Sequence, residues 1–427
     1  MGKTASPVLD RVLLAVVGLT SLVALAGVVW LWPSPRAHHP GLGSADSTPE
    51  ATKLVDATLL EVLAIPSPDP EVLLPGAKDV LITARRQDTG EVVTFDMTDE
   101  TGDTFAAGQK VRLAVTETPG QPTVYYVSDF RREGPMALLL GAFLCAVVAF
   151  GRLQGVRALV GLAFSFVVII GFMVPAILSG ESPVPVAVVG SLLIMVTTLY
   201  LSHGWSAKTT AACVGTAAAL LLTAGLAAVF VTASRITGLA SEDARLANLS
   251  VGSLSLRGLL LAGMILGGLG VLDDVTMSQA STVFALRRAN REAGFGELVR
   301  EALSVGRDHI AATVNTLFLA YAGASLPLLI LFSTGVDSAR VIVTSETVAV
   351  EVIRALVGSI GLIGAVPLTT AMAAAVALAD RSPAIAQPDA HGHVHMHAEL
   401  HVRLPPRRPP APEDDWEGRL RDAYGLP

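Results

Sequence analysis

One apolar stretch with two adjacent acidic residues constrains this chain more than any other feature. It runs from position 258 to position 286, and the only charges inside it are Asp273 and Asp274, between the flanking Arg257 and Arg287. A helix of that length extends about 43 Å, which is enough to cross a bilayer core and its headgroups. A carboxylate near the bilayer centre carries a high free-energy cost if it is charged and unpaired. Such a group is therefore usually paired with a cation, protonated or hydrated.

Small and polar residues of this stretch recur at helical spacing. Residues three and four apart share one face of a helix, and the residues on this face are Gly267, Gly270, Asp274, Ser278 and Ser281. The glycines, together with Gly263, are expected to let a neighbouring helix approach closely. The carboxylate and the two hydroxyls can bind a proton, an ion or water.

A second interpretation of the aspartates stays open. The helix could end near Leu272, and the two carboxylates would then be solvated caps at the cytoplasmic interface. Apolar residues resume after the pair, among them Val275, Met277 and Val283. That continuation favours an intramembrane acidic site.

The composition is that of a membrane protein. Hydrophobic residues make up 52% of the 427 residues and charged residues 16%, so a lipid bilayer is the expected partner. The net charge of −7 gives no indication of a nucleic-acid partner. No zincin, P-loop, Rossmann or nucleophile-elbow pattern occurs, so we expect neither an enzyme nor a cofactor.

Changes of pattern divide the chain into five parts. The expected parts are cytoplasmic residues and a first transmembrane helix over 1–32, a linker over 33–52, an extracytoplasmic β domain over 53–133, a seven-helix membrane domain over 134–379 and a disordered cytoplasmic tail over 380–427. The fold class is therefore an α-helical polytopic membrane protein, with about eight transmembrane helices, carrying a small β-barrel-like domain. Basic residues in the short loops place both termini in the cytoplasm.

The β domain is predicted from alternation with a period of two. Apolar and polar residues alternate in short runs separated by turn signals, and these runs are Leu54–Val62, Asp79–Arg85, Glu91–Asp96, Lys110–Thr116 and Thr123–Asp129. Strands of that number and length form a small barrel or sandwich. Such a domain could engage an external substrate or protein partner.

The region after the acidic stretch has two predicted elements. Residues of about 290–307 have the apolar spacing of an amphipathic helix lying on the membrane surface. A span from Ile310 to Phe332 follows, and Thr313 and Asn315 within it could complete a polar path with the aspartates. The last span, about Val352 to Leu378, contains Pro367.

The tail carries a run of alternating histidines. They are His391, His393, His395, His397 and His401. Imidazoles at this spacing can chelate Zn²⁺, Ni²⁺, Co²⁺ or Cu²⁺. A low-complexity segment with incidental metal affinity is the alternative.

The run GGLGVLDDVTMSQAS at positions 267–281 resembles the YibE/F-like family of bacterial multi-pass membrane proteins. The resemblance covers roughly residues 51–379 and implies an extracytoplasmic β domain followed by several membrane spans in the bacterial cell membrane. It implies no settled biochemical activity. Residues from 381 onward lie outside it.

A looser resemblance concerns mechanism. An apolar helix with a central acidic pair, followed by an amphipathic helix and a proline-containing span, is similar to the resistance-nodulation-division transporters and to SecD/SecF. In those families acidic residues on such a helix take part in proton coupling. This chain has additional spans, a smaller external domain and no intramembrane lysine to pair with the aspartates.

Three functions follow as hypotheses. The first is a proton- or cation-coupled transporter, or an energised accessory protein, that binds its ion at Asp273 and Asp274. The second is a membrane scaffold whose β domain binds a partner. The third is divalent-metal handling through the tail. The sequence does not indicate the substrate or the oligomeric state.

Overall fold

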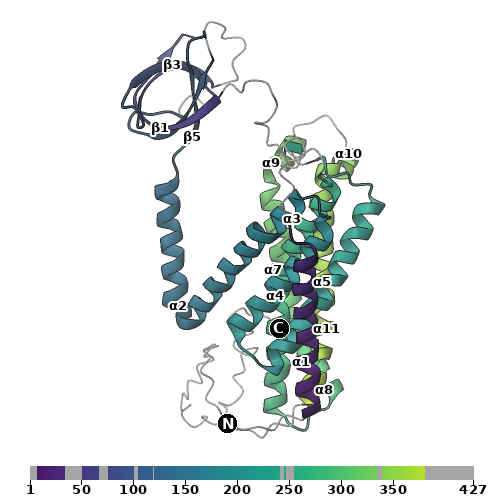
Figure 1. Ribbon diagram of the computed structural model, residues 1–427. Coiled ribbons are helices and arrows are strands. Elements are labelled where there is room, and N and C mark those ends of the chain that lie inside the picture. Colours follow the sequence, from purple (N-terminus) through teal and green to yellow (C-terminus); the bar gives the residue numbers. More distant parts are fainter. Residues whose placement is uncertain are drawn as a thin grey trace, which may run out of the picture. The chain divides into compact units, whose positions relative to one another are not determined.

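The computed structural model describes residues 7–33, 51–66, 76–100, 104–118, 120–240, 245–246, 254–333 and 339–379. The chain begins with helix α1 (Pro7–Trp30), continues through five strands, and then forms a series of helices up to Ala379. Figure 1 shows the strands as one curved sheet and the later helices as a bundle. The predicted order of strand region and helical region is observed.

The strands form one antiparallel sheet in the order β3-β2-β1-β4-β5. Their bounds are Ala51–Ile65 for β1, Lys78–Arg86 for β2, Val92–Asp99 for β3, Lys110–Glu117 for β4 and Val124–Phe130 for β5. The long β1 pairs with β4 through its first half and with β2 through its second half. The sheet curves so far that the rings of Phe95 in β3 and Tyr125 in β5, its two edge strands, stack with centroids 6.1 Å apart. The domain is thus an antiparallel half-barrel.

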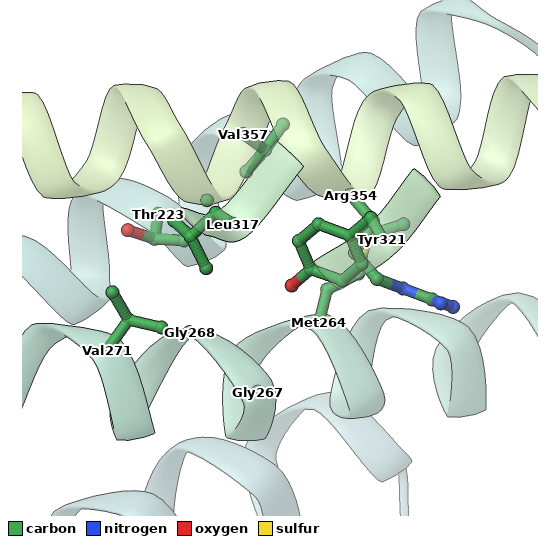
Figure 2. Close-up of a pocket in the computed structure, with 10 residues that line it drawn as sticks. Thr223, Met264, Gly267, Gly268, Val271, Leu317, Tyr321, Arg354 and Val357 are labelled. Carbon is green, nitrogen blue, oxygen red and sulfur yellow. The ribbon is translucent and has the colours of Figure 1, made fainter. Parts of the chain in front are cut away.

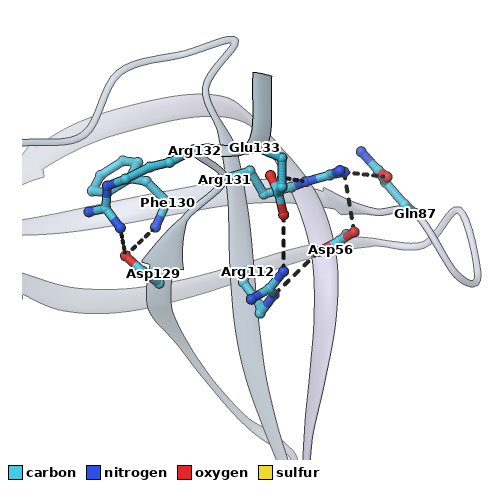
Figure 3. A network of polar contacts seen from close by, with 8 residues as sticks. All are labelled: Asp56, Gln87, Arg112, Asp129, Phe130, Arg131, Arg132 and Glu133. Carbon is cyan, nitrogen blue, oxygen red and sulfur yellow. Dashed lines mark hydrogen bonds and ion pairs between the residues drawn. The ribbon is translucent and has the colours of Figure 1, made fainter. Parts of the chain in front are cut away.

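A charge network joins the sheet to the first helix after it (Figure 3). Glu133, the first residue of α2 (Glu133–Val168), accepts hydrogen bonds from Arg112 and Arg131, both at 3.2 Å. The same two arginines form ion pairs with Asp56 of β1, at 3.6 Å and 3.2 Å. Each exposed pair contributes little alone, but two arginines shared by two carboxylates fix the helix start to strands β1 and β4.

Helix α2 reverses direction at Arg152. That residue has a positive φ of 48°, which a residue with a side chain rarely adopts, and Figure 1 shows α2 as two segments that meet in a sharp bend. Gly155 lies so close to the preceding segment that an added Cβ would be 3.0 Å from the Val147 carbonyl carbon. The second segment continues through one π turn, η1 (Ile169–Met173), into α3 (Val174–Leu178).

The remaining helices build the bundle. They are α4 (Pro183–His203), α5 (Ala207–Ala233), α7 (Leu256–Ala289), α8 (Phe295–Ala324), α9 (Leu326–Ser333), α10 (Ala339–Thr344) and α11 (Glu346–Ala379). Five stretches of the described helices are long and apolar enough to cross a membrane: Glu133–Leu178, α4, α5, α7 and α11. The protein is therefore a multi-pass membrane protein.

The region after α7 differs from the prediction. The structure joins the predicted amphipathic segment of about 290–307 and the first part of the predicted span from Ile310 into one helix, α8. No glycine–proline turn separates the two predicted segments, so α8 continues without a break through Ile310. It ends at Ala324 rather than Phe332, because Pro327 cannot extend the helix and instead lies in the first turn of α9.

Helices α5 and α11 contact each other through two reciprocal glycine–threonine pairs. A Cβ added to Gly361 of α11 would lie 3.1 Å from Thr223 Cβ of α5, and one added to Gly215 of α5 would lie 2.9 Å from Thr369 Cβ of α11. On each helix the threonine follows the glycine by eight residues. The two antiparallel helices therefore interlock at two levels, and α7 packs against both.

Candidate functional site on helix α7

Helix α7 places its two aspartates at mid-length but in different surroundings. Asp273 is half-buried, and its Oδ1 atom is fully buried with no hydrogen-bond partner among the described residues. Asp274 is exposed. Adjacent residues of a helix point about 100° apart, which accounts for the difference. The helix continues for 15 residues beyond Asp274, so the alternative in which it ends near Leu272 is wrong.

Asp273 lies among few charged groups. It is within electrostatic range of Asp274 and of the buried Cys213 of α5. No cation forms an ion pair with it among the described residues. An unpaired buried carboxylate carries a large desolvation cost, which a bound proton, a cation or water can relieve.

The next turn of α7 holds buried polar side chains that make hydrogen bonds to other helices. Gln279, which is 4% exposed, donates from Nε2 to Thr370 Oγ1 of α11 at 2.7 Å and to the Ala302 carbonyl of α8 at 2.9 Å. Thr276 and Thr216 of α5 share a hydrogen bond of 2.5 Å. These contacts tie α7 to α5, α8 and α11. The sequence pattern of α7 alone does not indicate these partners, because they lie on other helices.

The remaining predicted ion-binding residues are not gathered around the aspartates by direct contacts. Ser278 is exposed, and the Ser281 hydroxyl donates to the Met277 carbonyl of its own helix at 2.8 Å. On α8, Thr313 is half-buried and Asn315 is exposed. Within the described chain, no hydrogen bond joins these residues to either carboxylate.

The three glycines predicted to receive a neighbouring helix have open space instead. A Cβ added to Gly263, Gly267 or Gly270 would meet no described atom within 4 Å. The close contact on this helix is at Gly268, where an added Cβ would lie 3.5 Å from Thr223 Cγ2. Gly267, Gly270, Asp274 and Ser278 therefore form an open strip along α7, which we call the acidic strip.

One end of the acidic strip borders a small cavity between α5, α7, α8 and α11 (Figure 2). Gly267, Tyr321 of α8 and Arg354 of α11 line it. Arg354 Nη1 donates to both carboxylate oxygens of Glu351, each at 2.9 Å. Arg354 lies two turns into α11 and beside α7, a position that depends on helix packing and that no local sequence pattern indicates.

One further buried group was not singled out from sequence. His309 of α8 has its Nε2 atom buried with no hydrogen-bond partner among the described residues. A histidine beside charged neighbours at positions 307 and 308 gives no sequence signal of burial. The structure gives His309 no contact with either aspartate.

The predicted metal ligands of the tail lie outside the described residues, as does the whole segment from residue 380. In the described part of the chain, no group of three or more His, Cys, Asp or Glu residues is arranged to hold a metal ion. Metal binding by the tail stays a prediction.

Comparisons with known proteins give one result. Searches of curated proteins and of solved structures found no match, so the looser similarity to proton-coupled transporters stays a hypothesis. The family described as YibE/F-like protein matches residues 139–378. This range includes Asp273, Asp274, Thr276 and Gln279 of α7 and the residues of α5, α8 and α11 that they contact. Since this match covers more than half of the chain, the protein belongs to the YibE/F-like family.

Proposed function

We propose that the protein is a proton- or cation-coupled membrane transporter, or an energised accessory protein, and that Asp273 and Asp274 bind the ion. The observation that carries this proposal is the buried Asp273 Oδ1 without a hydrogen-bond partner among the described residues. A carboxylate kept for packing would be expected to be bonded as Gln279 is. An unsatisfied acid inside an apolar bundle is typical of ion-handling sites.

The two aspartates have complementary positions for ion exchange. Asp274 and Ser278 are exposed on the acidic strip, whereas Asp273 points into the bundle. An ion arriving along the strip would meet Asp274 first and reach Asp273 by moving around the helix. Cys213, which is within electrostatic range of Asp273, is buried and is not a cation that could pair with it.

We further propose eight membrane crossings with both termini in the cytoplasm. The reversal at Arg152 supports counting Glu133–Leu178 as two crossings, since a straight helix of 46 residues would extend about 69 Å. Helices α1 and α8 would supply the other two. This arrangement puts Arg152, Lys208 and Arg287 on the cytoplasmic side and the half-barrel outside.

The test is proton flux across membrane vesicles that contain the full chain. Respiration would first build a pH gradient across inverted vesicles, which a fluorescent amine reports. Pools of small solutes would then be added, and the rate at which the pH gradient collapses would be measured. Asp273→Asn and Asp274→Asn should each reduce solute-supported flux about a hundredfold, the scale of losing a proton-transfer group. Asp96→Asn, an exposed strand acid, is the matched control. Wild-type flux in both variants would contradict the proposal.

A scaffold is the second candidate function, favoured by the charge network that fixes α2 to the half-barrel. A rigid joint of this kind suits a domain that presents a partner-binding surface. In that case Asp274→Asn would lower the abundance or assembly of the protein, and neither the wild type nor the variant would show solute-supported proton flux. Quantifying folded protein in the same vesicles separates the two functions.

A further inference from the structure

The small cavity beside Arg354 lies where an ion from one end of the bundle would approach the aspartates. Helices α7 and α11 both begin at this end, at Leu256 and Glu346. Gly267 lies about three turns into α7 and Arg354 about two turns into α11. Asp274 follows Gly267 by seven residues on the same face, about 10 Å further along the helix. The open backbone of Gly267 and Gly270 connects the two.

The cavity has the size of one water molecule. Its space for water is about 10 Å³, close to the minimum that holds a single water. A hydrated metal cation is much larger and would have to lose its water shell before entering. A proton needs no such space, because it passes along hydrogen bonds between a water and neighbouring hydroxyls.

The polar groups around the cavity suit water. Figure 2 shows the Tyr321 hydroxyl pointing into the space between α7 and α11, with the Arg354 side chain extending on the other side of the tyrosine ring. The tyrosine hydroxyl can both donate and accept, and no described residue bonds to it. The Arg354 guanidinium is permanently charged, but it is paired with the Glu351 carboxylate, so the pair adds polar groups beside the cavity without a net charge.

We infer that this cavity is a water-filled entry through which protons, rather than metal cations, reach Asp274, with Tyr321 and Arg354 as its positioning residues. The inference rests on the proposed function and deepens it by naming the coupling ion. The helices around the route also carry the titratable side chains Cys213 of α5, Asp273 of α7, His309 of α8, and Tyr321 and the Glu351–Arg354 pair, besides charged residues nearer the helix ends.

The test is infrared spectroscopy of the full chain in lipid vesicles, which requires no knowledge of the substrate. The carboxyl bands of Asp273 and Asp274 would be assigned with the two Asn variants. The exchange of the carboxyl proton for deuterium would then be timed after transfer to heavy water, in sodium chloride and in choline chloride at the same pH.

Two variants, each with a matched control, sharpen the result. Tyr321→Phe should slow deuterium exchange about tenfold, the effect of removing one hydrogen-bonding group from the route, whereas Tyr126→Phe in β5 should not. The wild-type bands should be the same in sodium and choline. The pair variant Glu351→Gln/Arg354→Gln, which removes the paired charges at Arg354 without changing the net charge, should also slow the exchange, whereas Arg340→Gln, an exposed arginine of α10, should leave it as in wild type.

Each contrary outcome has a separate meaning. Wild-type exchange in Tyr321→Phe would overturn the entry route, and so would exchange equally fast in every variant. A sodium-dependent shift in the wild-type protein would overturn the choice of the proton and leave cation coupling in place. Carboxyl groups that never take up a proton or respond to sodium would overturn the proposed function together with this inference.

Discussion

Two consecutive turns of helix α7 differ in whether their polar side chains have hydrogen-bond partners. In the bonded turn, Thr276 and Gln279 are buried and reach partners on α5, α8 and α11. In the acidic turn, Asp273 has a buried oxygen without a partner and Asp274 is exposed. The difference teaches that burial alone does not define a functional polar residue in a membrane bundle. Satisfied groups fix the helices, and the unsatisfied carboxylate is the group left to bind an ion.

The strongest way to disturb the bonded turn is to separate the helices around it. Gly361→Ala places a Cβ against Thr223 of α5, so we expect a loss of about 3 kcal/mol in the free energy of unfolding from overpacking. Thermal unfolding in detergent, followed by circular dichroism, measures the change. Adding Thr223→Ala should restore part of the loss, because it removes the atoms that collide. Equal stability of Gly361→Ala and wild type would show that α5 and α11 are not interlocked here.

Removing the central hydrogen bonds should have a somewhat smaller effect. Gln279→Leu deletes the donors to Thr370 and Ala302, and we expect a loss of about 2 kcal/mol, the net value of two hydrogen bonds. The same unfolding assay applies. Thr370→Val combined with Gln279→Leu should cost less than the sum of the single changes. Strict additivity would mean that the two side chains do not act together.

The acidic turn should respond differently in the same assay. Asp273→Asn removes a buried charge but no hydrogen bond of Oδ1, so we expect the unfolding free energy to change by less than about 1 kcal/mol. Asp274→Asn, at an exposed position, should change it even less. A large destabilisation by Asp273→Asn would mean that this carboxylate has a structural partner, and the contrast between the two turns would disappear.

The smallest predicted effect lies in the half-barrel, where charges are paired in water rather than in an apolar bundle. Arg86 donates to both oxygens of Asp88, at 3.1 Å and 2.8 Å. This hydrogen bonding lowers the pKa of the Asp88 carboxyl and raises that of Arg86.

A lowered folded-state pKa stabilises the fold above the unfolded value of about 3.9, and the contribution disappears as pH falls through the folded value. Asp88→Asn should therefore slightly lower the unfolding temperature at neutral pH and have no effect in strong acid. Unfolding scans of both proteins from neutral to acid pH check this. A difference that grows as the pH falls would contradict the assignment.

Local elements could be predicted because their signals are local. Alternation located all five strands to within a few residues, for example Lys110–Thr116 against the observed Lys110–Glu117. Apolar length located α7 equally well, as 258–286 against the observed Leu256–Ala289. Each signal depends only on the period of apolar residues along one segment.

Contacts between distant helices could not be predicted. Gln279 and Thr370 are 91 residues apart, and Gly215 meets Thr369 only because α5 and α11 cross in one particular register. The position of Arg354 beside Gly267 depends on the same packing. The sequence identified the aspartates as candidates but not which one is buried, since that depends on the rotation of α7 within the bundle.

The contrast between the acidic turn and the bonded turn of α7 is tested most directly with two variants. For each variant, proton flux and unfolding temperature are measured on the same preparation. The account predicts that Asp273→Asn loses solute-supported proton flux while its unfolding temperature stays near that of wild type. It predicts that Gln279→Leu unfolds at a lower temperature while each folded molecule retains its flux. The reverse pattern, with Asp273→Asn unstable but active and Gln279→Leu stable but inactive, would contradict the account.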